Sequence, residues 1–299
     1  MPAFRLDRSL TLHFFQRLGR GGAKDRLPIL MYHSISEDPE EEVSPYYRVC
    51  TSPQRFRAQM QWLKDNGCCG VTLSDGVAWL DSALRPPPSA LRPVAITFDD
   101  GYRDFYTAAL PALRQHQCGA TVFLPTAFIG HERCRFKDRE CMTWDEVREA
   151  QSAGIEFGSH TVNHPKLYEL DLPRICAELK DSKVTLEREL GRPVTSFAYP
   201  YAFPSADRAF AKVFVAALKE TGYGCNVTTK IGLAAKPDDP FTLKRLPINS
   251  ADDQAMFLAK LAGAYDWLAG PQETFKMIKH LVTWRRSGLG GSLVSANNF

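Results

Sequence analysis

Two short runs of polar residues hold side chains that could assemble a metal-dependent hydrolytic site. The first run is TFDDGY, in which Asp99 and Asp100 follow an apolar, strand-like segment. The second is HTVNHP, in which His160 and His164 follow another such segment. One carboxylate and two imidazoles can hold a divalent metal ion with positions left open, and a second carboxylate beside them can accept a proton from an activated water.

The geometry of the two runs limits what each side chain can do. Adjacent residues of a strand face opposite sides, so Asp99 and Asp100 cannot both bind the ion, and one of them stays close by as a general base. Pro165 disfavours a helix at the residue before it, which is His164. We therefore expect His160 at the end of a strand and His164 in the turn beyond it.

The elements that position these residues are predicted from the alternation of apolar and amphipathic segments. Strands are expected at residues 27–35, 70–73, 94–98, 120–125, 155–160, 196–201, 225–229 and 242–247. Helices are expected at residues 52–66, 75–84, 102–116, 144–153, 172–190, 205–221, 251–262 and 272–284, and a charged loop at residues 131–140. Repeated strand–helix units imply parallel strands, and seven or eight units favour an α/β protein with a (β/α) barrel over an open doubly wound sheet. The two carboxylates, His160 and Tyr201 then lie at carboxyl ends of strands, where barrels build active sites.

Composition and charge narrow the class of protein. A chain of 299 residues with 44% hydrophobic residues is long enough for one large domain or two small ones. No apolar run approaches the ~20 residues that span a bilayer, and no secretory signal opens the chain, so a cytoplasmic location is expected. The formal net charge of +3 does not indicate a nucleic-acid partner. The eight cysteines are expected to be reduced thiols, and at Cys134 and Cys141 two unpaired thiols are favoured over a second metal site.

Both ends of the chain are basic. Leu10, Phe14 and Leu18 recur at helical spacing near the N-terminus. A basic amphipathic helix can lie on a membrane, which would place the protein at the inner membrane surface, but a helix docked on its own domain is favoured. The basic residues are Arg5, Arg8, Arg17, Arg20, Lys24 and Arg26 at one end, and Lys276, Lys279, Arg285 and Arg286 at the other.

With these residues in place, the sequence resembles the polysaccharide deacetylase superfamily, carbohydrate esterase family four, which contains the chitooligosaccharide deacetylases. TFDDG matches the first motif of that family and HTVNHP the second, and their order and spacing are highly specific. FAYPY, at residues 197–201, resembles the third motif. LMYH, at residues 30–33, resembles the branch of the poly-N-acetylglucosamine deacetylases. The resemblance spans roughly residues 28–250.

The resemblance implies a distorted (β/α) barrel that removes N- or O-acetyl groups from sugars. By match to the motifs, Asp100, His160 and His164 would bind a divalent metal, most commonly Zn²⁺, with Co²⁺, Ni²⁺, Mn²⁺ or Fe²⁺ as alternatives. Asp99 would be the general base. The backbone N–H of Tyr201 would help to stabilise the oxyanion.

The sequence departs from the pattern of that family at several positions. No histidine stands in the late strand to act as an acid, and Ala198 stands where the third motif has an arginine that steadies the base. Ala202 replaces the closing glycine of the motif. Arg245 is expected to take the place of the missing arginine, because it lies near the end of a predicted strand. His33 is the candidate acid, and a protonated Asp99 could also return its proton to the leaving group.

We therefore predict a metal-dependent hydrolase that deacetylates amino sugars of a polysaccharide, an oligosaccharide or a lipid-linked glycan precursor. Tyr102, Pro200 and Tyr201 flank the motifs and are expected near the acetylated glycan. Two alternatives remain: a deformylase or cyclic-amide hydrolase on the same fold, and a carbohydrate-binding protein whose catalysis has decayed. The predicted organisation is a basic extension at 1–27, one catalytic domain at 28–250, and a helical extension with a flexible tail at 251–299.

Overall fold

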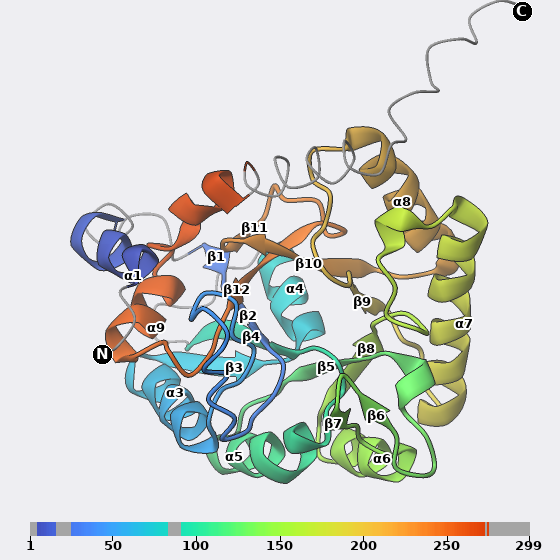
Figure 1. The fold of residues 1–299 in the computed structure, drawn as a ribbon, viewed down its shortest axis with the longest axis horizontal. Helices are drawn as coiled ribbons and strands as arrows, with labels where there is room; N and C mark the ends of the chain where they lie inside the picture. The colour runs from blue at the N-terminus through green and yellow to red at the C-terminus, as the bar shows by residue number, and fades with distance from the viewer. Residues whose placement is uncertain (1–4, 16–24, 83–90, 273, 275–299) are drawn as a thin grey trace, which may run out of the picture.

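The computed structural model describes residues 5–15, 25–82, 91–272 and 274 (Figure 1). A ring of parallel strands forms the centre of this part of the chain, and helices surround it. The ring strands are β2 (Ile29–Tyr32), β4 (Arg92–Phe98), β5 (Thr121–Leu124), β8 (Glu156–Ser159), β9 (Ser196–Ala198), β10 (Cys225–Ile231) and β12 (Leu243–Pro247). Each of these seven strands pairs with the next of the seven along the chain. β2 pairs with both β12 and β4, which closes the barrel. The predicted barrel is confirmed, with seven strands in its ring.

An eighth parallel strand lies outside that ring. β3 (Cys68–Val71) pairs with the amino-terminal half of β4, where Cys68 is opposite Arg92 and Val71 is opposite Ala95. β5 pairs with the other half of β4, beginning at Thr97. β3 therefore occupies the amino-terminal end of the barrel, where β4 and β5 are not yet paired.

The outer helices begin and end at residues that satisfy their terminal backbone groups. They are α3 (Pro53–Asp65), α5 (Leu110–His116) with the preceding η3 (Phe105–Ala109), α6 (Trp144–Ser152), α7 (Leu172–Leu190) and α8 (Arg208–Thr221), with short turns η4 (Thr126–Phe128) and η5 (Leu167–Glu169). Thr143 and Glu146 form the expected capping box at the start of α6. Gly191 ends α7 with a left-handed φ of 66°, as a C-terminal glycine does.

One helix closes the amino-terminal end of the barrel. α4 (Leu73–Asp81) appears inside the ring of strands in Figure 1. Its buried residues Leu73 and Leu80 belong to the interior cluster that also contains Ala95 and Phe123. α4 therefore fills the amino-terminal end of the barrel in the described part of the chain.

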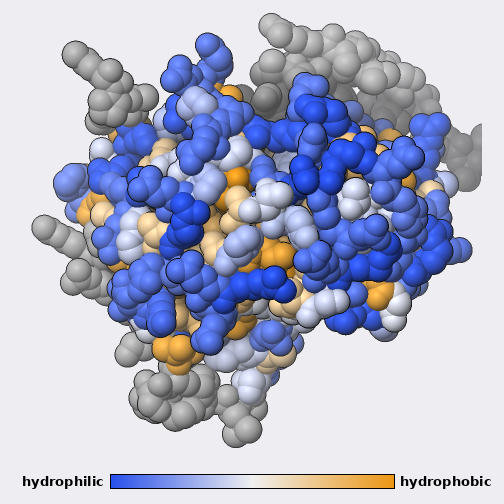
Figure 2. Space-filling model, turned by 90° about the horizontal axis from the view of Figure 1, so that it is seen from below, coloured by the Kyte–Doolittle hydropathy of each residue, from blue (hydrophilic) through white to orange (hydrophobic). Residues whose placement is uncertain are grey.

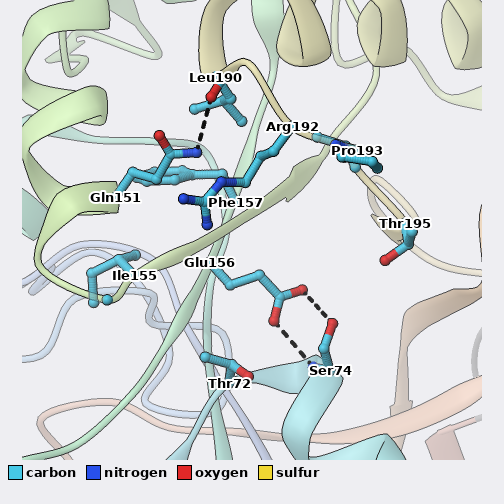
Figure 3. A pocket seen from close by; sticks show the side chains of 12 residues that line it. Thr72, Ser74, Gln151, Ile155, Glu156, Phe157, Leu190, Arg192, Pro193 and Thr195 are labelled. Atoms are coloured by element: carbon cyan, nitrogen blue, oxygen red, sulfur yellow. Dashed lines mark hydrogen bonds between the residues drawn. The ribbon is translucent and has the colours of Figure 1, made fainter.

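A cavity of about 300 Å³ lies at the closed end (Figure 3). Glu156, at the start of β8, accepts hydrogen bonds there from the backbone N–H and the hydroxyl of Ser74, at 3.1 and 2.9 Å. Its carboxylate also accepts from Thr121 and Ser196, each at 3.1 Å. These bonds tie α4 to three strands, so we assign this carboxylate a structural role away from the catalytic end.

Strand alternation decides which side chains face the barrel interior. On β4, Ile96 and Phe98 pack outward under the helices, whereas Ala95 belongs to the interior cluster. By the same alternation, Asp99 lies on the inward face together with Ala95 and Thr97. On β12, Leu243 faces inward, and Arg245 follows it on the same face.

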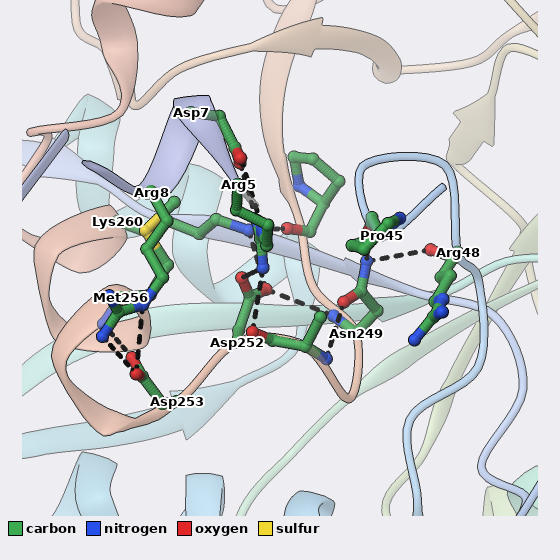
Figure 4. A network of polar contacts seen from close by, with 12 residues as sticks. Arg5, Asp7, Arg8, Pro45, Arg48, Asn249, Asp252, Asp253, Met256 and Lys260 are labelled. Carbon is green, nitrogen blue, oxygen red and sulfur yellow. Dashed lines mark hydrogen bonds and ion pairs between the residues drawn. The ribbon is translucent and has the colours of Figure 1, made fainter. Parts of the chain in front are cut away.

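The N-terminal segment docks on the last described helices (Figure 4). Its elements are α1 (Leu6–Leu10) and η1 (Thr11–Phe15), and they lie beside α9 (Gln254–Leu261) and η6 (Asp266–Leu268). Arg5 donates to the Ala251 carbonyl at 2.8 Å and pairs with Asp252 at 3.3 Å. Arg8 pairs with Asp253 at 2.5 Å.

Aromatic and buried ionic contacts complete this docking. Phe15 stacks on Trp267 with ring centroids 5.0 Å apart. Asp252 is fully buried and also accepts a hydrogen bond from the equally buried Lys260 at 2.7 Å. The basic helix therefore contacts its own domain, which was the favoured expectation for residues 5–15.

Parts of the predicted extensions lie outside the described residues. Nearly all of the helix predicted at 272–284 does so, as do Arg17, Arg20, Lys24, Lys276, Lys279, Arg285 and Arg286. The short strand β1 (Arg26–Leu27) pairs with β11 (Ala234–Ala235), so the proposed boundary at residue 27 falls directly after a strand of the fold. The division into 1–27, 28–250 and 251–299 stays a prediction.

The sequence 131–140, expected to be a loop, contains a β-hairpin. β6 (Arg135–Phe136) pairs antiparallel with β7 (Arg139–Glu140), and Lys137 and Asp138 form the turn with φ values of 48° and 60°. The expectation failed because two-residue strands carry no alternating pattern that a sequence can display.

The polarity of the surface and the state of the cysteines match the expectations drawn from the composition. Figure 2 shows a face on which hydrophilic side chains dominate and hydrophobic ones are confined to small areas. Among the described residues, no helix is long and apolar enough to span a membrane. All eight cysteines are unpaired thiols.

Gly158 of β8 is predicted to be essential to the packing inside the barrel. A Cβ at this position would lie 2.5 Å from the Phe123 ring and 2.6 Å from the Ser196 hydroxyl. We expect Gly158→Ala to lower the free energy of unfolding by about 1–3 kcal/mol, the usual effect of overpacking. Urea denaturation measures this change, and Gly270→Ala is the control because open space surrounds Gly270. Equal stabilities of the Gly158 variant and the wild type would contradict the packing described.

Candidate active site

Three candidate ligands converge at the carboxyl ends of β4 and β8. Asp100 is the second residue after β4, His160 directly follows β8, and His164 lies in the turn beyond. All three are buried, and one potential ligand atom from each lies within 4.8 Å of the others. Among the described residues this is the one such cluster, so the structure gives no support to a metal site at Cys134 and Cys141.

The two oxygens of the Asp100 carboxylate have different surroundings. Oδ2 accepts hydrogen bonds from the Tyr102 hydroxyl at 2.9 Å and from Lys137 Nζ at 3.1 Å. Oδ1 is buried, and no described residue hydrogen-bonds to it. It lies 3.6 Å from His160 Nε2 and 3.3 Å from His164 Nε2. Burial opposes ionisation of Asp100, but the surrounding histidines and Lys137 hold its pKa well below the ordinary value.

The His160 ring is oriented by a backbone carbonyl. Its Nδ1 lies 2.7 Å from the carbonyl oxygen of Ala198, which can only accept, so Nδ1 carries the proton. Burial, partly offset by the carboxylates of Asp99 and Asp100, lowers the pKa of His160 to about 4. The imidazole is therefore neutral near pH 7, and the lone pair of Nε2 is directed at the cluster.

The turn that carries His164 is held by hydrogen bonds from its own backbone. The His164 N–H donates to the Thr161 hydroxyl at 2.9 Å. The N–H groups of Val162 and Asn163 donate to Glu178 of α7, at 2.8 and 2.9 Å. Thr161 and His164 have left-handed φ values of 72° and 52°. The turn thereby brings the two imidazoles to a centroid separation of 4.7 Å.

This donor set fits a divalent metal ion. A buried carboxylate oxygen without a hydrogen-bond partner is unfavourable unless a cation satisfies it. His160, fixed through its Nδ1, has the usual form of a histidine ligand, whereas the buried Nδ1 of His164 has no hydrogen-bond partner among the described residues. Asp100, His160 and His164 are thus suited to hold such an ion, with positions left for a water and a substrate oxygen.

Asp99 forms a buried ion pair with Arg245. The guanidinium donates to both carboxylate oxygens, each at 2.7 Å, and Arg245 is fully buried. Its Nε donates to the Thr228 carbonyl at 3.0 Å and its Nη1 to the Thr97 hydroxyl at 3.2 Å. Burial alone would raise the pKa of Asp99, but the charge of Arg245 outweighs it and lowers that pKa to about 2. Arg245 therefore stands beside the carboxylate that the sequence assigned to it.

His33 lies on the other side of Asp99. Its Nε2 is 3.9 Å from Asp99 Oδ2, and its side chain is 21% exposed. Burial lowers the pKa of His33, and the carboxylates of Asp99 and Asp100 act in the opposite direction. The imidazole therefore lies close to Asp99 but beyond direct hydrogen-bond distance, and its side chain is partly exposed.

The expected substrate residues occupy different positions. Tyr102 is buried and contacts Asp100 rather than the open side of the site. Tyr201 is 46% exposed, has a φ of 57°, and its ring packs edge-on against His164 at 4.6 Å. Pro200 is buried before it. Of these three, Tyr201 borders the entrance.

Lys137 is the residue of the site that the sequence did not reveal. The β6–β7 hairpin carries it to Asp100 Oδ2, and its ammonium also lies over the rings of Phe136 and Tyr201, at 4.6 and 5.5 Å. A lysine in a charged segment has no pattern that distinguishes it from its exposed neighbours. The tight turn at Lys137 and Asp138 was the one available signal.

Comparison with known proteins identifies the family of this chain. The sequence profile described as polysaccharide deacetylase matches residues 88–224. The Bacillus subtilis protein named "Putative polysaccharide deacetylase YxkH" is 30% identical over 240 residues, which cover 80% of this chain and 76% of that protein. The chain belongs to the polysaccharide deacetylase family. Its predicted membership is confirmed, and the members of this family are hydrolases.

Other relatives extend the comparison. The poly-β-1,6-N-acetyl-D-glucosamine N-deacetylase of Staphylococcus epidermidis is 26% identical over 66% of this chain and 67% of that protein. The Streptococcus pyogenes deacetylase PplD, solved in complex with acetate, is 27% identical with a TM-score of 0.67, over 79% of this chain and 98% of that one. IcaB from Ammonifex degensii, at 22% identity and a TM-score of 0.64, shares the fold over 80% of this chain and 97% of its own.

Removing Arg245 is predicted to destabilise the protein, because Asp99 would remain buried without its counter-charge. We expect Arg245→Met to lower the free energy of unfolding by about 3–5 kcal/mol, and Asp99→Asn combined with Arg245→Met to lower it by clearly less. Chemical denaturation of the two variants and the wild type in the presence of a chelator measures this difference.

The same ion pair predicts a pH dependence. The pKa of Asp99 is about 2 in the folded protein against an ordinary 3.8, so its stabilisation is fully present above about pH 4. This stabilisation is lost as the pH falls toward 2. The difference in the free energy of unfolding between the wild type and Arg245→Met should therefore narrow between pH 4 and pH 2. A gap that stays constant down to the acid transition would show that Asp99 is not paired.

Proposed function

We propose that this protein is a metal-dependent deacetylase that removes N-acetyl groups, and also O-acetyl groups, from amino sugars of a polysaccharide, an oligosaccharide or a lipid-linked glycan precursor. The observation that carries the proposal is the convergence of Asp100, His160 and His164 at the open end of the barrel, with Asp99 beside them. The names of two relatives, a polysaccharide deacetylase and a poly-β-1,6-N-acetyl-D-glucosamine N-deacetylase, support an acetylated glycan as the substrate class.

The three ligands would hold a divalent metal ion, with Zn²⁺ proposed and Co²⁺, Ni²⁺, Mn²⁺ and Fe²⁺ as alternatives. Such an ion supplies Lewis acidity toward the acyl carbonyl and the attacking water. The chain contributes the orientation of the ligands: the Ala198 carbonyl turns His160, and donors on Oδ2 turn Asp100.

Asp99 is proposed to accept the proton of the attacking water. Arg245 engages one lone pair on each carboxylate oxygen, so a second lone pair on each remains available. The same contact keeps Asp99 ionised and fixes its rotation toward the cluster. A base with so low a pKa is weak, so its contribution depends on position and on the lowered pKa of the water.

The leaving amine needs a proton, and two groups of this chain are placed to supply it. His33 stands 3.9 Å from Asp99 and reaches the solvent-accessible side. Asp99 itself carries a proton after the attack and can return it. We propose His33 as the donor, and the backbone N–H of Tyr201 as a donor to the oxyanion.

The contact of Arg245 and the choice of substrate bear on the two alternative functions. Arg245 contacts Asp99 and thereby supplies the arginine that Ala198 does not, which weighs against a decayed, carbohydrate-binding protein. A deformylase or cyclic-amide hydrolase would use the same side chains, so the substrate distinguishes it from a deacetylase.

We propose a cytoplasmic location with peripheral contact at the inner membrane surface. Arg5 and Arg8 are already paired with aspartates of the domain, so membrane contact would fall to the other basic residues of the termini. Vesicle sedimentation with anionic lipids addresses this contact.

Acetate release should depend on both the metal and Asp99. With N-acetylated glucosamine oligomers, we expect activity that a chelator abolishes and added Zn²⁺ or Co²⁺ restores. Asp99→Asn should reduce kcat by about a hundredfold to ten-thousandfold, the range of general base catalysis, while the protein still binds metal. Bound metal without acetate release from any acetylated sugar would favour a deformylase or cyclic-amide hydrolase, and a protein that binds no metal would favour a carbohydrate-binding protein whose catalysis has decayed.

His33→Ala should separate the two proton donors. If His33 protonates the leaving amine, kcat falls by about a hundredfold while metal content stays unchanged. His116→Ala is the control, because His116 lies on an outer helix. A variant within a few-fold of the wild type would assign the proton return to Asp99 alone.

A further inference from the structure

Asp100 has more positive charge around it than a metal ligand requires. Its Oδ2 accepts from a neutral donor, the Tyr102 hydroxyl, and from a cationic one, Lys137. Its Oδ1 is left for the cluster. The hydroxyl alone would fix the rotation of the carboxylate, so the lysine adds mainly charge.

Lys137 is held in this position by the anchoring of its hairpin. Arg139 pairs with Asp38 at 2.5 Å and donates to the Ser34 hydroxyl at 3.0 Å, which ties β7 to the segment after β2. Arg133 pairs with Glu146 at 2.6 Å, which ties the other arm to α6. The anchored hairpin therefore fixes the backbone from which the half-exposed Lys137 side chain reaches Asp100.

The other charged groups of the site do not neutralise Lys137. Asp99 is matched by Arg245, and a histidine that binds a metal ion does so as the neutral imidazole. The single negative charge of Asp100 thus faces Lys137 and, in the loaded protein, a divalent ion as well. The loaded site then carries two excess positive charges.

We propose that Lys137 sets the charge of the metal centre: it weakens the hold of Asp100 on the ion and strengthens the hold of the site on an anionic oxygen. The inference rests on the proposed function, because it requires the ion at Asp100, His160 and His164. Repulsion between a unit and a double positive charge a few ångströms apart lowers metal affinity. The same positive charge stabilises the oxyanion that the acyl carbonyl oxygen becomes, and it also stabilises the carboxylate of an acetate product.

Two variants separate charge from orientation. Lys137→Met removes the charge and leaves the Tyr102 hydroxyl on Asp100. Tyr102→Phe removes the neutral donor and leaves the charge. We expect Lys137→Met to bind Zn²⁺ about tenfold more tightly, or better, from the lost repulsion. Tyr102→Phe should bind it about 10- to 100-fold more weakly, as loss of an orienting partner does.

The experiment measures two affinities that should change in opposite directions. Zn²⁺ affinity is obtained by competition of the metal-free full chain with a chromophoric chelator. Acetate affinity is obtained from the visible spectrum of the Co²⁺-loaded protein. For Lys137→Met, acetate should bind about tenfold more weakly while metal binds more tightly. Lys137→Arg should restore both values toward those of the wild type.

Controls and contrary outcomes are well defined. The control variant is Lys180→Met, which removes an exposed lysine of α7 and should leave the Zn²⁺ affinity and the acetate affinity unchanged. A misfolded site would lose metal, so tighter metal binding cannot come from damage. Metal affinity of Lys137→Met that is unchanged or weaker, or unchanged acetate affinity, overturns the inference while the proposed function stands. A wild-type chain that binds neither Zn²⁺ nor Co²⁺ overturns both.

Discussion

The buried ion pair between Asp99 and Arg245 is the contact on which the rest of the site depends. It joins β4 to β12 across β2, the strand that closes the barrel. Thr97 takes part, since its hydroxyl accepts from Arg245 and donates to the Leu30 carbonyl of β2 at 2.6 Å. The Asp99 carboxylate, the proposed general base, is therefore fixed by the same interactions that close the strand ring.

The value of this pair lies in orientation more than in stability. Transfer of two charges into a protein interior offsets most of their attraction, and an apolar pair of similar volume is often as stable. What an apolar pair cannot provide is an ionised carboxylate with a fixed direction. Asp100, one residue later, faces His160 and His164 because the chain turns there with a φ of 70°. One strand end thus delivers two carboxylates with separate electrostatic partners.

Much of this site could be predicted from the sequence, and the reason is local. Asp100, His160 and His164 all lie within five residues of the end of an apolar strand, and parallel strands bring their carboxyl ends to one edge. Arg245 was predictable for the same reason, as a cation near the end of a strand. Lys137 was not, because its position depends on ion pairs that anchor a hairpin to distant segments. Tyr102 was placed near the site, but strand geometry alone could not tell that it would point beneath Asp100 and not at a substrate.

The backbone at the site shows why these positions resist simple substitution. Asp100, Thr161, His164 and Tyr201 all have left-handed φ values without being glycine. Each such residue costs about 1–3 kcal/mol, which persists only where surrounding contacts enforce it. Those contacts are present: Glu178 holds the turn before His164, and the Thr229 hydroxyl donates to the Tyr201 carbonyl at 3.0 Å. Glycine would relieve the strain at any of them but would remove a proposed metal ligand, the hydroxyl that supports one, or the ring beside one. The strain therefore follows from the convergence of these side chains, since they meet only if the chain reverses direction within a few residues of each strand end.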